Sequence, residues 1–330
     1  MSLRVLLSIV LLGPLLMGCG DHTSSTGPRA STTRDAARAP ATRRPAVPEV
    51  AAANLSHWRL PFPVARAVAI PMRRGSVVLA GGLLVGDRSS GRAFRLDPRT
   101  GVEHALPSLA VPVHDAAGGL VARAPTVVGG GNSAEQSAVQ TLAPGGWRRI
   151  ADLPTTRSDL GVAEWRGSAY VIGGYDGASV PRTILRLSPH QAPRPVGALL
   201  DGVRYAAMAR IGSDVYVFGG EVAGRELDTI QEVDLATGRT SPAGRLRVPL
   251  GHAMAVPVAG RILVMGGRVA PYRQTDAMWW YDPASGDLRL AGRLPVHLSD
   301  AAVATYGRRI WLLGGESPGI TDRVVAVGLR

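Results

Sequence analysis

The sequence contains no lysine and a single cysteine, and both absences limit what the chain can be. Cys19 has no partner with which to form an internal disulfide. All 37 basic residues are arginine, which fits the alanine-, glycine- and proline-rich usage of a GC-rich genome. Aromatic residues make up only 5% of the chain against 45% hydrophobic residues, so a large core must consist mainly of valine, leucine, isoleucine and alanine.

Several functional motifs are also missing. There is no G-x-G-x-x-G or Walker loop to hold a phosphate, and no G-x-S-x-G nucleophile elbow, so neither a cofactor nor serine hydrolysis is expected. The formal charge of +12 is spread along the chain, with no run longer than two arginines. Such a spread favours anionic partners in general, but nucleic-acid binding needs a basic stripe on a suitable fold. We therefore expect no nucleic-acid partner.

The N-terminus predicts export. Residues 1–18 read as a signal peptide whose apolar segment, interrupted by Gly13 and Pro14, is too short to span a membrane. Leu16-Met17-Gly18-Cys19 resembles a bacterial lipobox, which implies lipidation of Cys19 after cleavage. The alternative is an ordinary secreted protein with a chance cysteine. Residues 19–54 are rich in serine, threonine, alanine, proline and arginine, which predicts a disordered tether. The expected location is the periplasmic or extracellular side of the cell envelope, with the membrane as a partner through the anchor.

The rest of the chain repeats one pattern, an apolar run that ends in two glycines. The copies are spaced 48, 44, 46, 47 and 48 residues apart, and a strand-bearing period in the forties indicates small sheets arranged radially. The first glycines of the pairs are Gly81, Gly129, Gly173, Gly219, Gly266 and Gly314.

Each repeat reads as four strands. The first is an alternating stretch such as Asp159–Glu164, and the second ends at the glycine pair. The third and fourth are joined by a turn that begins with aspartate and ends with glycine, as in Asp234–Gly238. We interpret the glycine pairs as scaffold, because strands that converge on an axis leave no room for a side chain there.

These features resemble Kelch repeats over residues 55–330. The resemblance rests on the apolar-apolar-Gly-Gly pattern, on Arg157-Ser158-Asp159, and on the tail Trp147–Pro154 (WRRIADLP). The tryptophan of that tail is legible only in the second repeat and near the N-terminus. The resemblance implies an all-β, six-bladed β-propeller with four antiparallel strands per blade. Arg323–Arg330 reads as a third strand without a fourth, so we expect Ser56–Pro61 to complete the last blade and close the ring.

The candidate ligand-binding residues are those expected at the mouth of the central channel. They stand about fourteen residues before each first glycine, or directly after a glycine pair, so both sets fall on one face of a propeller. They are Arg66, His114, Asp115, Asp159, Arg204, Tyr205, Glu221, His252, Asp300 and Glu316. The alternative for Asp159, and for the nearby Arg157, is a structural role in which they bind backbone amides of the neighbouring blade. No catalytic residue and no metal ligand is assigned, although His114, Asp115, His252 and Asp300 could converge on a metal ion.

Three functions compete on this scaffold. The first is a binding or scaffold module for a glycan, peptide or envelope protein. The second, implied by resemblance, is a sugar mutarotase similar to the N-acetylneuraminate epimerases, in which Arg66 and Arg204 would hold a sugar carboxylate and Glu221 or Glu316 would move a proton. The third, a copper oxidase resembling galactose oxidase, needs a cysteine–tyrosine crosslink, and the sole cysteine is committed to lipid. We favour the binding module, with the mutarotase as the alternative.

The lipid anchor gives a direct prediction. Replacing Cys19 with alanine removes the acylated thiol, so the protein should fold normally but move from the membrane fraction to the soluble fraction. Fractionation followed by immunoblotting measures this. A Cys19→Ala protein that stayed entirely in the membrane fraction would rule the anchor out.

Overall fold

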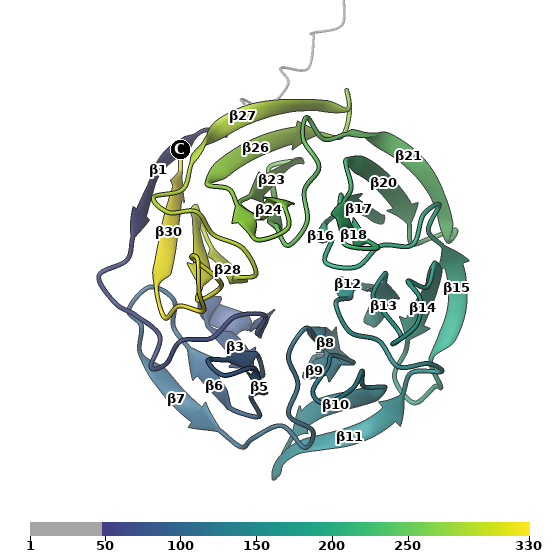
Figure 1. The fold of residues 1–330 in the computed structure, drawn as a ribbon. Helices are drawn as coiled ribbons and strands as arrows, with labels where there is room; N and C mark the ends of the chain where they lie inside the picture. The colour runs from purple at the N-terminus through teal and green to yellow at the C-terminus, as the bar shows by residue number, and fades with distance from the viewer. Residues whose placement is uncertain (1–47) are drawn as a thin grey trace, which may run out of the picture. The chain divides into compact units, whose positions relative to one another are not determined.

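The computed structural model describes residues 48–330, which form six four-stranded antiparallel sheets around a central axis (Figure 1). The predicted six-bladed propeller is confirmed. The signal peptide, Cys19 and most of the predicted tether lie outside the described residues. Between residues 48 and 330 no helix is long and apolar enough to cross a bilayer; the helical content described is one 3₁₀ turn, η1 (Arg73–Gly75).

The strand order within each blade follows the chain from the axis outward (Figure 1). Blade 1 contains β2 (Val68–Pro71), β3 (Val77–Ala80), β6 (Ala93–Leu96) and β7 (Glu103–Leu106). Blade 2 contains β8 (Ala117–Val121), β9 (Ala124–Val128), β10 (Ala138–Ala143) and β11 (Gly146–Asp152). Blade 3 contains β12 (Gly161–Trp165), β13 (Ser168–Ile172), β14 (Thr183–Leu187) and β15 (Arg194–Ala198).

The remaining blades repeat this order, and the last takes its outer strand from the other end of the described chain. Blade 4 contains β16 (Ala207–Ile211), β17 (Asp214–Phe218), β20 (Thr229–Asp234) and β21 (Arg239–Arg245). Blade 5 contains β22 (Met254–Val258), β23 (Arg261–Met265), β26 (Ala277–Asp282) and β27 (Asp287–Arg293). Blade 6 contains β28 (Ala302–Tyr306), β29 (Arg309–Leu313), β30 (Val324–Leu329) and β1 (Val50–Leu55).

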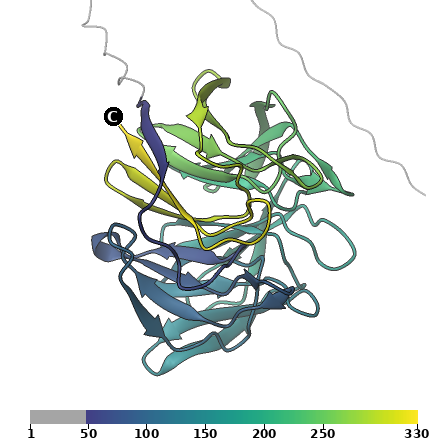
Figure 2. The ribbon, with the colours of Figure 1, turned by 60° about the vertical axis from the view of Figure 1, so that its left-hand side comes forward.

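The ring closes as predicted, but with a different segment. β1 pairs antiparallel with β30, from Val50 opposite Leu329 to Leu55 opposite Val325, whereas Ser56–Pro61 forms no strand and leads across to blade 1 (Figure 2). The predicted tether end at residue 54 is therefore wrong as well. An outer strand has one face in solvent, so the small residues of Val50–Leu55 are sufficient to pair there without an apolar alternation that the sequence could reveal.

The two faces of the ring have different connections. On the face we call lower, short turns join the first strand to the second in every blade and the third to the fourth in blades 1–5. On the upper face, loops follow the glycine pairs and link one blade to the next. Three of these loops form small hairpins: β4 (Leu83–Leu84) with β5 (Arg88–Ser89), β18 (Glu221–Val222) with β19 (Arg225–Glu226), and β24 (Arg268–Ala270) with β25 (Arg273–Gln274).

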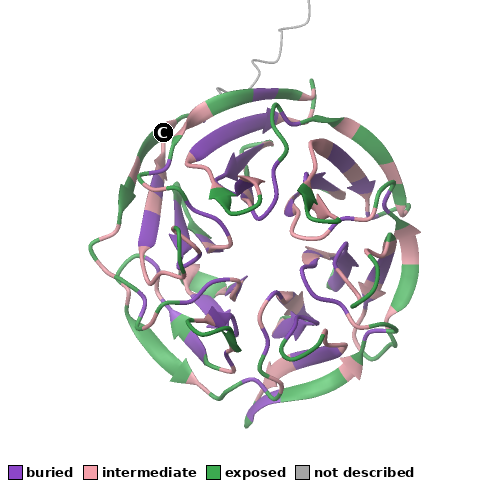
Figure 3. Ribbon diagram, viewed as in Figure 1, coloured by how far each residue is buried: buried purple, intermediate pink, exposed green. Residues whose placement is uncertain are grey.

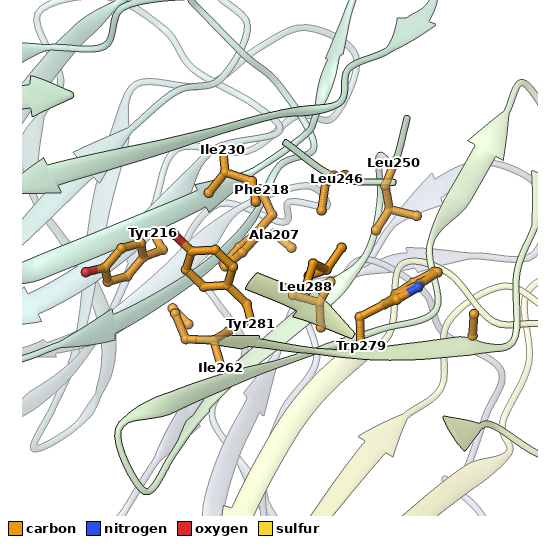
Figure 4. Close-up of a cluster of buried hydrophobic side chains, with 13 residues drawn as sticks. Ala207, Tyr216, Phe218, Ile230, Leu246, Leu250, Ile262, Trp279, Tyr281 and Leu288 are labelled. Atoms are coloured by element: carbon orange, nitrogen blue, oxygen red, sulfur yellow. The ribbon is translucent and has the colours of Figure 1, made fainter. Parts of the chain in front are cut away.

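The hydrophobic core lies between the blades. Six clusters of buried apolar side chains each combine residues of two adjacent blades, so every blade is held on both faces. Between blades 4 and 5, the rings of Phe218 and Tyr281 meet edge to face at 5.2 Å (Figure 4). The Tyr281 hydroxyl also donates a hydrogen bond to the carbonyl of Ala243. The second strand of each blade is buried along most of its length, and the outermost strands are largely exposed (Figure 3).

The glycine pairs seat one blade against the next, as the sequence predicts. A Cβ on the first glycine would lie only 2.0–2.6 Å from a backbone carbonyl oxygen of the following blade; at Gly219 that oxygen belongs to Leu250. The second glycine donates its N–H to the same carbonyl, as from Gly220 to Leu250 at 2.9 Å. The contact recurs six times and closes from Gly315 of blade 6 to Val64, just before blade 1.

Alanine substitutions at two glycines of blade 4 separate the cost of losing this contact from the cost of backbone strain. Gly219 and Gly224 both have positive φ, but a Cβ at Gly224 has no neighbour within 4 Å. Either alanine substitution should cost about 1 kcal/mol from left-handed backbone strain, and Gly219→Ala should cost about 2 kcal/mol more because it pushes blades 4 and 5 apart. Urea unfolding measures both free energies. Equal losses of unfolding free energy for the two variants would show that the contact between Gly219 and the Leu250 carbonyl is not tightly packed.

Candidate functional site

Six residues, one ahead of each blade, surround the upper end of the channel in the left-handed backbone conformation, with φ between 52° and 57°. Their amides form a closed ring, because each N–H donates to the carbonyl of the equivalent residue before the preceding blade at 2.8–3.3 Å. The six are Arg66, Asp115, Asp159, Tyr205, His252 and Asp300. Aspartate and histidine tolerate this conformation better than most residues, which suits four of the six positions.

The sequence located this ring correctly in five repeats. In the first repeat, counting fourteen residues back from the glycine gives Ala67, whereas the structure places Arg66 in the ring. The segment that precedes Gly81 is thus one residue longer in blade 1, where η1 occupies the turn between β2 and β3. Because Arg66 was already a candidate, the set of side chains at the mouth is unchanged.

The ring encloses a cavity of about 130 Å³ at the channel mouth. Its walls are the six ring residues and, beneath each, a small or aliphatic residue such as Ala116 or Leu160. Ligand pockets for drug-sized molecules usually have volumes of about 300–1,000 Å³. In this conformation the mouth therefore has room for a few atoms and not for a whole sugar acid.

Arg66 and Arg268 are held by carboxylates on both sides. Arg66 Nη1 lies 3.0 Å from Asp115 Oδ2, and its Nη2 lies 3.1 Å from Glu316 Oε1. The other Glu316 oxygen receives Arg268 Nη2 at 2.6 Å, and the same nitrogen lies 2.9 Å from Asp300 Oδ2. Burial alone would lower the pKa of Arg66, but Asp115 and Asp300 outweigh it and raise the pKa. Glu316 thus bridges two guanidinium groups.

His252 sits between two carboxylates. Its Nδ1 lies 2.7 Å from Asp300 Oδ1, and its Nε2 lies 3.5 Å from Glu221 Oε2. Burial lowers the pKa of His252, but the charge and hydrogen bond of Asp300 more than compensate, so the pKa is raised. Burial likewise works against Asp300, yet His252 and the two arginines lower its pKa overall. The Tyr205 ring stacks on the imidazole at 3.9 Å.

Asp159 differs from the other carboxylates at the mouth. Burial raises its pKa, repulsion from Asp115 adds to the effect, and Arg204, whose Nε lies 3.1 Å away, only partly offsets them. The pKa of Asp159 is about 7. Arg204 itself lies over the rings of Tyr175 and Tyr205, at 5.0 and 4.6 Å. Of the three arginines at the mouth, Arg204 has the most exposed side chain, at 26%.

Two residues lie differently from expectation. In a six-bladed ring blade 2 lies across from blade 5, so His114 was expected to face His252; the contacts seen are instead local, from its Nδ1 to the Ser89 hydroxyl at 2.8 Å and from its Nε2 to Asp115 Oδ2 at 3.6 Å. Arg157 is structural, as the alternative proposed, but its guanidinium donates to Gly173 and Thr183 within its own blade and not to the neighbouring one. Within residues 48–330 no three His, Cys, Asp or Glu side chains are placed to hold a metal ion, so the possible convergence of His114, Asp115, His252 and Asp300 is not seen.

The mouth is a nearly self-neutral network. Arg66, Arg204, Arg268 and His252, whose pKa is raised, face five carboxylates: Asp115, Asp159, Asp300, Glu221 and Glu316. Arg268 was not among the candidates, although its place directly after a glycine pair is the signal that selected Glu221 and Glu316. Because each guanidinium already has a carboxylate partner, an anionic ligand would have to displace an internal ion pair.

Asp159 makes the stability of the propeller depend on pH. Its folded pKa of about 7 exceeds the unfolded value, so its contribution is present at low pH and is lost as the pH rises from about 4 to about 7. The free energy of unfolding should therefore fall between pH 5 and pH 8, and Asp159→Asn should reduce that fall by on the order of 2 kcal/mol.

Urea unfolding at the two pH values tests this dependence, with Asp176→Asn as the control. Backbone N–H groups of Ser179 and Ala178 lower the pKa of Asp176, so that carboxylate stays charged throughout this range and its loss should leave the slope unchanged. The assignment is refuted if the Asp159→Asn slope equals that of the unaltered protein.

No protein-family profile matches the sequence, and no curated protein matches it. Chains of known structure do match the fold. One of them, described as the structure of YjhT, superposes with a TM-score of 0.69 at 16% identity, covering 82% of this chain and 94% of that one. At this identity the likeness establishes the fold alone. Together with the six glycine-seated blades, it supports a Kelch-like β-propeller.

Proposed function

We propose that the protein is exported, anchored to a membrane through lipid on Cys19, and used as a binding module whose ligand contacts the loops of the upper face. The observation that supports a binding module over an enzyme is the state of the channel mouth. The mouth offers about 130 Å³, and each of its arginines is paired with an internal carboxylate. Recognition by the surrounding loops needs no opening of this network.

The tips of the upper hairpins carry exposed apolar residues. Tyr272, between β24 and β25, has 91% of its surface exposed, and Val85, between β4 and β5, has 62%. An aromatic ring held out on a tight hairpin is the type of residue that anchors protein partners and stacks on sugar rings, because it buries a large area at little cost in conformational entropy. We infer that Tyr272 contributes to the ligand-binding surface for a glycan, peptide or envelope protein.

The alternative is a mutarotase or epimerase similar to the N-acetylneuraminate epimerases. One observation favours it: Asp300, His252 and Glu221 form a carboxylate–imidazole–carboxylate chain whose Glu221 end is partly exposed. Such a chain can hold a proton on Glu221 or release it. Arg204, partly exposed between two tyrosines, would be the group that grips the substrate carboxylate.

A binding experiment with residues 45–330 distinguishes the binding module from the mutarotase. For the binding module, a glycan array or an envelope-protein extract should give a saturable ligand whose affinity falls at least about tenfold in Tyr272→Ala. Tyr306→Ala, the same substitution on the lower face, is the control and should bind normally. Unchanged affinity in Tyr272→Ala would remove the hairpin tips from the ligand-binding surface.

Two results would instead establish the mutarotase. These are saturable binding of N-acetylneuraminate that is lost in Arg204→Ala, and accelerated interconversion of its anomers observed by NMR. Neither result is expected for the binding module.

A further inference from the structure

The lower face of blades 1–3 carries a cluster of arginines that we call the arginine patch. Its members come from the turns between first and second strands and from the lower ends of β6 and β14, and all but the half-buried Arg186 are exposed. They are Arg73, Arg74, Arg95, Arg123, Arg166 and Arg186. Blades 4 and 5 carry aspartates and glutamates at the same level, among them Asp214, Glu232, Asp234, Asp282 and Asp287.

The positive charges of the patch are not neutralised by neighbouring carboxylates. Among residues 48–330, none of its six arginines forms an ion pair, in contrast to the arginines at the channel mouth. The Arg166 guanidinium lies over the Trp165 ring, and Arg186 donates to the Ser168 hydroxyl. Half-buried Glu164 accepts the N–H of Leu120 beside the patch, and burial raises the pKa of that carboxyl. Unpaired cations gathered on one surface repel each other and attract anions.

The arginines line two cavities that meet at Arg123. One, of about 520 Å³, is bounded by Arg73, Arg74, Arg95 and Arg123. The other, also about 520 Å³, is bounded by Arg123, Arg166 and Arg186. No acidic residue lines either one. Guanidinium groups bind phosphate oxygens through paired hydrogen bonds, so each cavity matches a phosphate-bearing head group.

A third cavity adds an apolar surface. It measures about 620 Å³, runs between blades 2 and 3, and shares Ala122, Ser188, Pro189 and Gln191 with the second basic cavity. Its walls are mostly aliphatic, and Ile150, at its edge, is 53% exposed. Basic cavities continuous with an apolar groove fit a ligand that carries both phosphate and hydrocarbon. A soluble polyanion carries no hydrocarbon that could be buried in the groove.

The described chain begins on this same face. β1 starts opposite the end of β30, where the N–H groups of Glu49 and Arg330 donate to each other's carbonyl oxygens. Third strands end at the lower face, so the segment that contains Cys19 joins the propeller there. A propeller tethered from its lower face would present the arginine patch to the membrane and leave the upper loops free.

We propose that the arginine patch binds the anionic lipid surface of a membrane and orients the propeller with its upper face outward. The choice of a membrane rests in part on the proposed anchor, but the binding itself does not require Cys19. An arginine near an anionic membrane contributes about a fivefold gain in affinity, so the six together provide an attachment that is weak alone and effective beside a tether.

The test uses residues 45–330, which contain every described strand and all six core clusters and pack as one compact unit. Its binding to phosphatidylcholine vesicles with and without phosphatidylglycerol is measured by sedimentation at low and high salt. We expect binding only to the anionic vesicles, and at least about a 100-fold loss in the triple variant Arg73→Glu, Arg95→Glu, Arg123→Glu. High salt should reverse the binding.

A second triple variant, Arg88→Glu, Arg225→Glu, Arg273→Glu, is the matched control. It changes the net charge equally but on exposed hairpins of the upper face, so it should lose much less affinity. Thermal melts check that both variants fold. No binding to anionic vesicles, or equal losses in the two triple variants, overturns the proposal.

Heparin and Ile150→Ser distinguish a lipid from a soluble polyanion. Ile150→Ser should weaken binding to vesicles and leave binding to heparin unchanged. Tight binding to heparin without binding to vesicles would overturn the membrane assignment. Membranes from cells carrying Cys19→Ala are washed in high salt, which releases protein held only by the patch. Protein that stays on the washed membranes then reports on the anchor alone, so failure of the anchor and failure of the patch are distinguishable.

Discussion

The ring of six backbone hydrogen bonds at the channel mouth is the constraint on which the rest of the structure depends. Each link joins two blades, and the last, from the N–H of Arg66 to the carbonyl of Asp300, closes the circle. The bonds hold six residues in a left-handed conformation that costs most side chains on the order of 1 kcal/mol, and the inter-blade core and glycine seats supply the stability that offsets it. Because backbone, and not sequence-specific packing, forms the ring, the side chains at these positions are free to be polar.

That freedom explains the electrostatics of the two faces. At the upper face the ring brings carboxylates, arginines and a histidine together in a small, partly buried space. Burial there raises the pKa of Asp159, and the neighbouring Asp300 raises the pKa of His252 against the effect of burial. At the lower face the six arginines of the arginine patch form no ion pair with any residue that the structure describes. A self-neutral mouth favours recognition by the loops around it, and the unpaired arginine patch favours binding to an anionic surface.

Much of this was readable from the sequence, and the misses have physical causes. Glycine pairs are obligatory where a carbonyl lies about 2 Å from a would-be Cβ, so their period reported the blade number directly. The closing strand was assigned too late because Val50–Leu55 has one face in solvent and no apolar alternation. Arg66 was one position out of register because blade 1 has a longer first turn. The pairing of Arg268 with Asp300 and Glu316 depends on side-chain directions, which spacing does not encode.

Hydrogen exchange at the six ring amides is the most direct test of the account. They belong to Arg66, Asp115, Asp159, Tyr205, His252 and Asp300, and each lies in a loop that connectivity alone would leave open to exchange. If the closed ring holds the blades together, all six should exchange as slowly as the central strands, through global unfolding. Exchange at the rate of the exposed hairpin tips, at even two neighbouring positions, would show that the ring is open and contradict the account.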